Sequence, residues 1–158
     1  MKRIAYTVLG VFALDQASKW LVVQRLNLQS VGEIEVLPPY LTFRMAWNKG
    51  VNFGLFGNNA TIMPYLLIAL SLAISIGVLI WTRNAPDWRA HIAAGLLIGG
   101  ALGNSLDRLL YGAVADFLNM SCCGIANPYA FNVADIAIFA GAIGLIIWGD
   151  AGKAKKSR

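Results

Sequence analysis

Two aspartates, Asp116 and Asp135, stand beside long apolar segments, where a carboxylate is costly. Asp116 ends the segment 113–116, and Asp135 lies at the start of the apolar run 132–148. An ionisable side chain at membrane depth needs a partner or a function. Two carboxylates that lie close together share a proton, so one can accept a proton from water while the other donates one. The pair predicts general acid–base chemistry, provided that the fold brings the two aspartates together.

The composition indicates that the bilayer is the solvent for much of this chain. Of the 158 residues, 58% are hydrophobic and 13% are charged, whereas soluble domains carry about 25% charged residues. Four apolar segments approach the ~20 residues that a membrane span requires: 4–23, 62–81, 91–110 and 132–148. We therefore expect one domain, residues 1–158, that is an all-α integral membrane bundle of four transmembrane helices.

The start of the chain has a second interpretation. Lys2 and Arg3 precede an apolar run, as in a secretory signal peptide. A cleaved signal peptide would release a soluble protein, but three more apolar segments follow here. We favour an uncleaved first helix.

Lysine and arginine orient the expected helices. They precede the first segment, occupy the loop between the second and third, and end the chain: Lys2, Arg3, Arg83, Arg89, Lys153, Lys155, Lys156 and Arg158. Cytoplasmic flanks of membrane spans carry such an excess. Both termini are therefore expected in the cytoplasm, with outward connections at 24–60 and 111–131. These flanks explain the net charge of +5 without a nucleic-acid partner.

The first outward connection contains two segments of alternating polar and apolar residues. Residues 33–37 and 40–47 alternate in this way, and Pro38-Pro39 separates them. Alternation with aromatic and β-branched residues is typical of half-buried strands. We expect a small outward β-sheet between the first two helices.

Charged and amide side chains also occur within the expected helices. Asp15 and Lys19 are four residues apart and share a helix face. They are expected to form a neutralising pair with a structural role, since a carboxylate held by a lysine stays ionised.

The third helix combines small residues with a polar face. Glycines recur at every fourth position, which allows another helix to approach closely: Gly95, Gly99 and Gly103. Asn104, Asp107 and Arg108 lie on an adjoining face. They form either a buried network that fixes helix packing or a polar cavity that binds an anionic or carbonyl group. In the second case Asp107 holds Arg108 in place.

Amides accompany the two aspartates. Asn132 and Asp135 are three residues apart at the start of the fourth helix, and share a face. If the third and fourth helices are neighbours, Asp116 and Asp135 meet near the outer surface. There they would perform the chemistry of an aspartyl protease.

Asn48 and Gly50 lie in a glycine-rich stretch that is either a plain loop or the rim of a substrate groove.

Other chemistries have little support in the sequence. His91, the single histidine, lies at the cytoplasmic end of the third helix, which disfavours a Ser-His-Asp triad on the outer side. Two aspartates with amides are weak ligands for zinc, so neither a metal nor a cofactor is expected. Cys122 and Cys123 are adjacent in an outward loop, where they form a strained disulfide, pair with another chain or stay reduced.

Five motifs resemble those of the lipoprotein signal peptidase family of bacteria, the type II signal peptidases. They occur in order along nearly the whole chain: Asp15-Gln16-Ala17-Ser18-Lys19, Asn48-x-Gly50, Gly99–Arg108, Ala113–Phe117 and Phe131–Asp135. The resemblance implies an intramembrane aspartic protease in the bacterial cytoplasmic (inner) membrane, with its active site toward the periplasmic face.

The resemblance also implies the substrate and the roles of individual residues. The substrate is a diacylglyceryl-modified prolipoprotein, cut just before the lipidated Cys, and membrane lipid is the other partner. Asp116 and Asp135 match the catalytic pair, and the expected substrate-binding residues are Asn48, Gly50, Asn104, Arg108 and Asn132. The supporting residues are Asp15, Lys19 and Asp107.

Some positions depart from the family pattern. Asn52 stands where a small residue is usual, Ile136 stands where a small polar residue is common, and the loop 119–130 is atypical. These departures concern loop closure and substrate range.

Two other functions remain open from the sequence. One is a proton-coupled transporter in which the aspartates relay protons, and the other is a structural partner or inactive relative.

Overall fold

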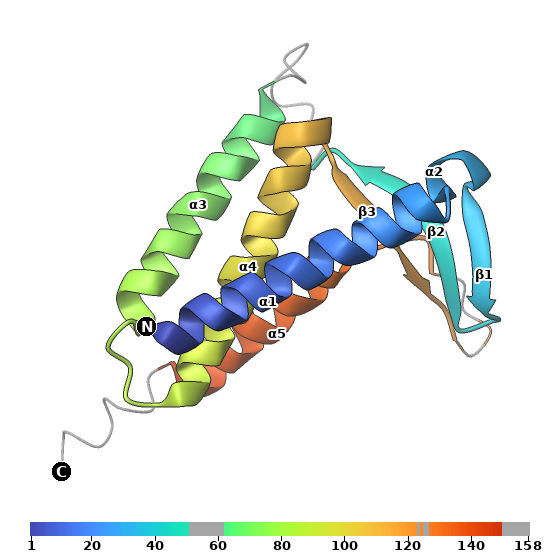
Figure 1. The fold of residues 1–158 in the computed structure, drawn as a ribbon. Coiled ribbons are helices and arrows are strands. Elements are labelled where there is room, and N and C mark those ends of the chain that lie inside the picture. The colour runs from blue at the N-terminus through green and yellow to red at the C-terminus, as the bar shows by residue number, and fades with distance from the viewer. Residues whose placement is uncertain (51–61, 123, 125–126, 150–158) are drawn as a thin grey trace.

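The computed structural model describes residues 1–50, 62–122, 124 and 127–149, and it consists mostly of helices with a small antiparallel sheet at one end (Figure 1). The long helices are α1 (Lys2–Lys19), α3 (Met63–Thr82), α4 (Trp88–Tyr111) and α5 (Val133–Trp148). A π-helical segment, η1 (Trp20–Arg25), continues α1, and the short helix α2 (Leu28–Val31) follows it.

Helix α4 lies at the centre of the helical part and packs against α1, α3 and α5. Its glycines form the contact with α1: a Cβ atom on Gly95 would lie 2.5 Å from Cβ of Thr7, and one on Gly99 would lie 2.9 Å from the Val8 carbonyl oxygen. The expectation that these glycines allow close helix approach is confirmed.

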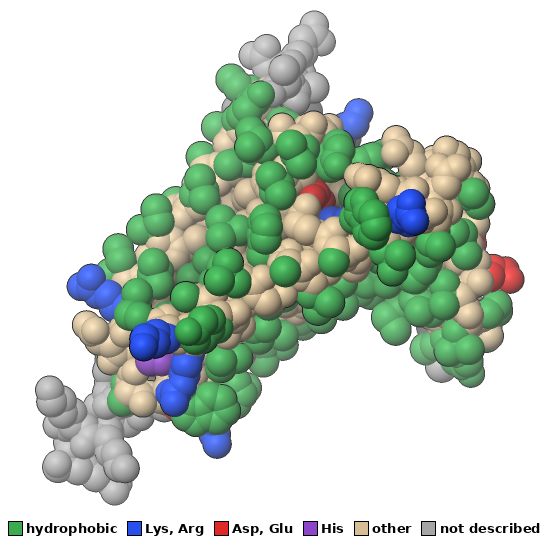
Figure 2. All heavy atoms as spheres, in the orientation of Figure 1, with side chains coloured by type: hydrophobic (Ala, Val, Ile, Leu, Met, Phe, Trp, Pro, Cys, Tyr) green, Lys and Arg blue, Asp and Glu red, His purple; other side chains and the backbone are tan. Residues whose placement is uncertain are grey.

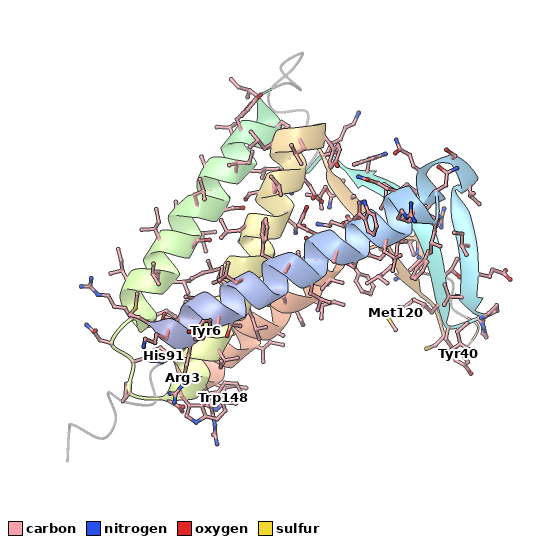
Figure 3. All side chains as sticks on the ribbon, viewed as in Figure 1. Arg3, Tyr6, Tyr40, His91, Met120 and Trp148 are labelled. Carbon is pink, nitrogen blue, oxygen red and sulfur yellow. The ribbon has the colours of Figure 1, made fainter. Side chains whose placement is uncertain are left out.

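The surface of the helical part is largely apolar. Within the described residues, α3 is the one helix that is both long and apolar enough to cross a bilayer, and α5 is apolar but only 16 residues long. Hydrophobic side chains cover the helices in Figure 2, with lysine and arginine gathered at the end away from the sheet. Arg3, His91 and Trp148 lie at that end, whereas Tyr40 and Met120 lie at the sheet (Figure 3).

The sheet has the strand order β1-β2-β3 and all pairs are antiparallel. Its strands are β1 (Glu33–Leu37), β2 (Leu41–Asn48) and β3 (Val114–Met120). The hairpin of β1 and β2 corresponds to the two alternating segments of the sequence. The third strand was not predicted, because residues 114–120 show no clear alternation and were treated as part of a connection.

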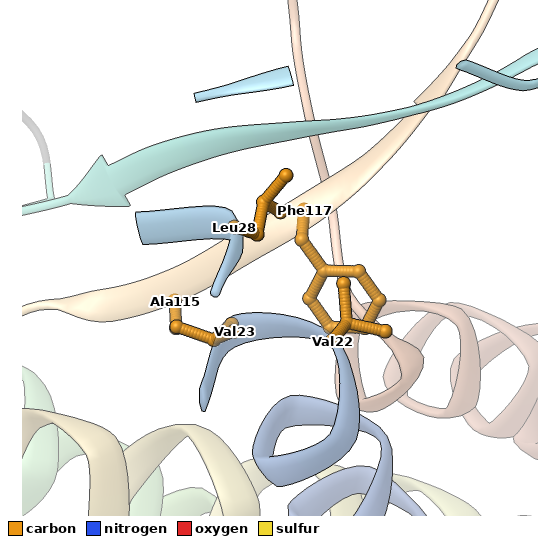
Figure 4. Packing of buried hydrophobic residues seen from close by; sticks show 5 residues of the cluster. All are labelled: Val22, Val23, Leu28, Ala115 and Phe117. Atoms are coloured by element: carbon orange, nitrogen blue, oxygen red, sulfur yellow. The ribbon is translucent and has the colours of Figure 1, made fainter. Parts of the chain in front are cut away.

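The two faces of β3 have different surroundings because successive side chains of a strand point to opposite sides. Ala115 and Phe117 face η1 and α2, where they pack with Val22, Val23 and Leu28 (Figure 4). Asp116, between them in sequence, points away from this cluster. The cluster therefore anchors the strand and leaves Asp116 directed toward α4 and α5.

Candidate active site

The position of Asp116 is set by the end of α4 and by its register in the sheet. Gly112 adopts a left-handed conformation (φ 70°) that ends the helix and turns the chain into β3. The Ala115 backbone N–H donates to Oδ2 of Asp107 at 3.1 Å, which ties the strand to the helix. Asp116 pairs with Ala46 of β2 and is only 3% exposed.

Asn132 connects the two aspartates. It precedes α5 and forms a reciprocal cap, in which its Oδ1 accepts from the Asp135 N–H at 2.9 Å and its own N–H donates to Oδ2 of Asp135 at 3.1 Å. Its Nδ2 donates to Oδ1 of Asp116 at 2.6 Å. A single fully buried side chain thus holds Asp116 and Asp135 in one site.

Asn104, on α4, supplies a further donor to Asp135. Its Nδ2 donates to Oδ1 of Asp135 at 2.8 Å, and its Oδ1 accepts from Nδ2 of Asn132 at 3.1 Å and from Nζ of Lys19 at 3.2 Å. An ammonium group only donates, so Lys19 fixes the orientation of the amide. Asp135 consequently receives hydrogen bonds on both carboxylate oxygens.

Lys19 is buried between two carboxylates. Its Nζ lies 2.8 Å from Oδ2 of Asp15 and 2.7 Å from Oδ2 of Asp107. The structure thus shows the expected pair of Asp15 and Lys19. The expectation that Asp107 holds Arg108 is wrong, because neighbouring residues on a helix point in different directions and Asp107 pairs with Lys19.

Asp15 and Gln16 extend this cluster to neighbouring helices. Oδ1 of Asp15 accepts from the Ala134 backbone N–H at 2.9 Å, which links α1 to the first turn of α5. Nε2 of Gln16 lies 3.1 Å from Oδ2 of Asp15 and 3.2 Å from Oδ1 of Asp107. Gln16 was not among the predicted site residues, although its place directly after Asp15 in the first motif was a usable signal.

Arg108 is half-buried beside the two aspartates. Nη1 contacts the Asn104 carbonyl oxygen at 3.4 Å, and the charges of Asp135 and Asp116 attract the guanidinium. Its buried Nε has no hydrogen-bond partner within the described part of the chain. Arg108 therefore keeps a donor for a group that enters the site.

Asn48 and Gly50 approach Asp116 from the end of β2. The Asn48 side chain hydrogen-bonds to Asp116, while its Oδ1 accepts from the Gly50 N–H at 2.9 Å. Gly50 has φ 90°, and a Cβ atom there would lie 2.5 Å from Cδ1 of Leu67, so a larger residue is excluded. The expectations for Asn52 and for Cys123 fall on residues outside the described part.

The electrostatics of Asp116 favour its protonated form. Burial raises the pKa of Asp116, and repulsion from Asp135 raises it further, to about 6, although hydrogen bonds from Asn48 and Asn132 and the charge of Lys19 act in the opposite direction. Asp116 therefore keeps a proton up to a higher pH than an ordinary aspartate, beside a carboxylate that accepts two hydrogen bonds.

Within the described residues, no group of three or more His, Cys, Asp or Glu is placed to hold a metal ion. His91 lies at the end of the helices opposite the sheet (Figure 3).

The fold is similar to that of solved bacterial membrane enzymes. A bacterial membrane enzyme structure determined by the in meso method at 1.9 Å resolution matches with a TM-score of 0.77 and 25% identity, over 93% of this chain and 92% of that one. A second one, at 2.3 Å resolution, matches with a TM-score of 0.74 over 100% of this chain and 94% of that one, also at 25% identity. The fold is thus that of a membrane enzyme.

The sequence comparisons identify the family. The family described as "Signal peptidase (SPase) II" matches residues 7–149. The lipoprotein signal peptidase of Methylorubrum extorquens is 44% identical, over 89% of this chain and 81% of that protein. The one from Rhodopseudomonas palustris (strain CGA009) is 37% identical, over 87% and 89%. The chain belongs to the signal peptidase II family, which confirms the resemblance of the five motifs and makes the protein a protease.

Proposed function

We propose that this protein removes the signal peptide from diacylglyceryl-modified prolipoproteins, and that Asp116 and Asp135 activate the water that cuts the bond before the lipidated Cys. Membership of the signal peptidase II family supports the reaction. The observation that carries the assignment of the two aspartates is Asn132, whose side chain and backbone hydrogen-bond to Asp116 and Asp135 respectively.

The two aspartates receive different roles from their surroundings. Asp135 accepts hydrogen bonds from Asn104 and Asn132 at the N-terminus of α5, so both of its carboxylate oxygens are held in place beside Asp116. It is the general base. Asp116 is buried and its pKa is raised to about 6, so it holds the shared proton and is the general acid.

Hydrolysis then proceeds in two proton-balanced steps. Asp135 takes a proton from water as the water oxygen bonds to the scissile carbonyl carbon, and Asp116 gives its proton to the carbonyl oxygen. In the second step Asp116 recovers a proton from one hydroxyl of the tetrahedral intermediate, Asp135 donates its proton to the leaving nitrogen, and the C–N bond breaks. Both carboxyl groups return to their starting states.

Arg108 and Asn48 are proposed to bind substrate next to the two aspartates. The free Nε donor of Arg108 suits a carbonyl oxygen of the peptide or of the ester-linked lipid, since guanidinium groups present several donors in fixed directions. Asn48 is exposed at the end of β2, where it can contact an extended peptide while it hydrogen-bonds to Asp116. Gly50 keeps the chain close to α3.

We further propose that α1 with η1, α3, α4 and α5 are four membrane spans with both termini in the cytoplasm, and that the sheet and the site face the periplasm from the inner membrane. The support is the separation of charge. Lys2, Arg3, Arg83 and Arg89 lie at one end of the helices, as cytoplasmic flanks do, and the sheet lies at the other (Figure 1). We assign the positive charge of these helix flanks to contact with membrane lipid, and we propose no nucleic-acid partner.

The assignment is tested by cleavage of a purified precursor with and without its diacylglyceryl group. Asp116→Asn and Asp135→Asn each remove a carboxyl group that transfers a proton, with little change in shape, so each is expected to lower cleavage of the lipidated precursor about 10²–10⁴-fold. Asp87→Asn, which changes a half-buried carboxylate that caps α4 at its N-terminus, is the matched control and should retain activity. Normal cleavage by either site variant in correctly inserted protein would disprove the pair.

A further inference from the structure

A cavity lined by apolar, aromatic and charged side chains lies on the side of β3 that faces away from Asp116. It has a volume of about 370 Å³, and Ala115, which neighbours Asp116 but points to the opposite face, forms part of its wall. Its other walls come from α1, η1, α2 and the ends of β2 and α4. Small-molecule sites have volumes of ~300–1,000 Å³, so the cavity has the size of a ligand site distinct from the two aspartates.

Aromatic rings line the mouth of this cavity. Trp20, Trp47 and Tyr111 contribute to it, and the rings of Trp47 and Tyr111 lie 5.6 Å apart at 53°. Aromatic faces attract cations, quaternary and primary ammonium groups among them. Tryptophan and tyrosine are also enriched at the level of lipid headgroups.

The floor of the cavity, among the described residues, contains one carboxylate and one ammonium group whose N–H bonds are all in use. Asp107 and Lys19 both line it, and the three N–H groups of Lys19 are taken by Asp15 at 2.8 Å, Asp107 at 2.7 Å and Asn104 at 3.2 Å. Asp107 accepts hydrogen bonds from Gln16 on one oxygen and from the Ala115 N–H on the other. Lys19 therefore has no N–H left for an anion, whereas a carboxylate oxygen of Asp107 can accept a further hydrogen bond from the ammonium group of a ligand.

An arginine borders the aromatic wall. The guanidinium of Arg25 lies 5.4 Å from the ring centre of Trp20 and is exposed. It can bind a phosphate at the mouth while an ammonium group occupies the interior. Together these features match a zwitterion with a phosphate and an ammonium separated by a short linker.

We propose that this cavity binds the headgroup of a zwitterionic phospholipid with an ammonium group, such as phosphatidylethanolamine. The ammonium lies against Trp47, Tyr111 and Asp107, and the phosphate lies at Arg25. Because Lys19 joins the cavity floor to Asn104, a bound headgroup also supports the α1 side of the catalytic site.

Native mass spectrometry of the full-length protein tests this proposal with phosphatidylethanolamine and phosphatidylglycerol of identical acyl chains. Phosphatidylethanolamine should bind about fivefold more tightly, and Tyr111→Leu should remove most of that preference. Arg25→Gln should weaken both lipids, because both carry the phosphate. Tyr129→Leu, which removes a tyrosine that is 76% exposed on the other outward connection, is the matched control and should behave as the unmodified protein.

Several outcomes would overturn the proposal. Equal binding of the two lipids, or a preference that survives Tyr111→Leu, would exclude an ammonium site in this cavity. Displacement of the lipid by equimolar soluble phosphoethanolamine would show that a free solute is the ligand. Asp116→Asn should bind phosphatidylethanolamine as the unmodified protein does, since headgroup binding requires neither Asp116 nor Asp135. This titration separates lipid binding from catalysis.

Discussion

At the scale of single residues, the site depends on placing two chemically identical side chains in different surroundings. Asp135 lies at a helix N-terminus and accepts from Asn104 and Asn132, whereas Asp116 is buried on a strand. Burial and the neighbouring charge of Asp135 raise the pKa of Asp116. These surroundings support the proposed roles of Asp116 as the general acid and Asp135 as the general base.

The pH dependence of activity should report the proton on Asp116. Since the general acid must be protonated, kcat/KM for a lipidated precursor should decline as the pH rises through about 6. Asn48→Ala removes a hydrogen bond that lowers the pKa of Asp116, so the decline should move to higher pH. Arg44→Ala, an exposed substitution on the same strand, should leave the profile unchanged. A profile unaffected by Asn48→Ala would contradict the acid role of Asp116.

At the scale of elements, glycines on α4 bring three helices close enough to share one polar network. A Cβ atom on Gly103 would lie 2.6 Å from Oδ2 of Asp15. Asp15 in turn accepts from the Ala134 N–H in the first turn of α5. The same close packing that joins α1 to α4 thus positions the helix that carries Asp135.

Gly103→Ala should therefore damage both stability and activity. The added methyl group must displace the Asp15 carboxylate, which loosens its contacts with Lys19 and Ala134. We expect the free energy of unfolding to fall by about 1–3 kcal/mol, with a loss of cleavage activity. Gly77→Ala on α3 is the control, because nothing lies within 4 Å of its Cβ position, and it should be neutral or stabilising by up to about 1 kcal/mol. Thermal unfolding in detergent measures both, and equal stability of the two variants would refute the argument.

At the scale of the whole molecule, charge and apolar surface indicate how the protein sits in the bilayer. Large apolar side chains on α3 are exposed, among them Leu70, Ile76 and Ile80, which is favourable when lipid surrounds the helix. The candidate site and the sheet lie at the end opposite to the lysines and arginines that flank the helices.

Cysteine labelling in intact cells tests this orientation. In a background with Cys122→Ser and Cys123→Ser, Tyr129→Cys should react with a membrane-impermeant maleimide added from outside. Arg83→Cys, in the loop between α3 and α4, should react only after the membrane is opened. The opposite pattern would place the site in the cytoplasm.

The sequence by itself determined the features that arise within short windows. The apolar segments, the alternating residues of β1 and β2 and the spacing of Asp15 with Lys19 are local patterns, and the helices, the hairpin and the ion pair reflect them. The order of the motifs was enough to identify the signal peptidase II family. Asp116 and Asp135 were recognisable from the sequence because a carboxylate beside an apolar membrane segment is energetically costly and so indicates a partner or a function.

Only the tertiary structure decided which polar groups meet. Lys19 forms an ion pair with Asp107, and the Asn104 amide donates to Asp135. Asp15 accepts a hydrogen bond from the Ala134 backbone N–H. In each case the two partners lie far apart in the sequence. Strand β3 and the cavity behind it likewise depend on the packing of β3 against α4 and η1. Such contacts follow from how whole helices pack, and no periodicity within one segment encodes them.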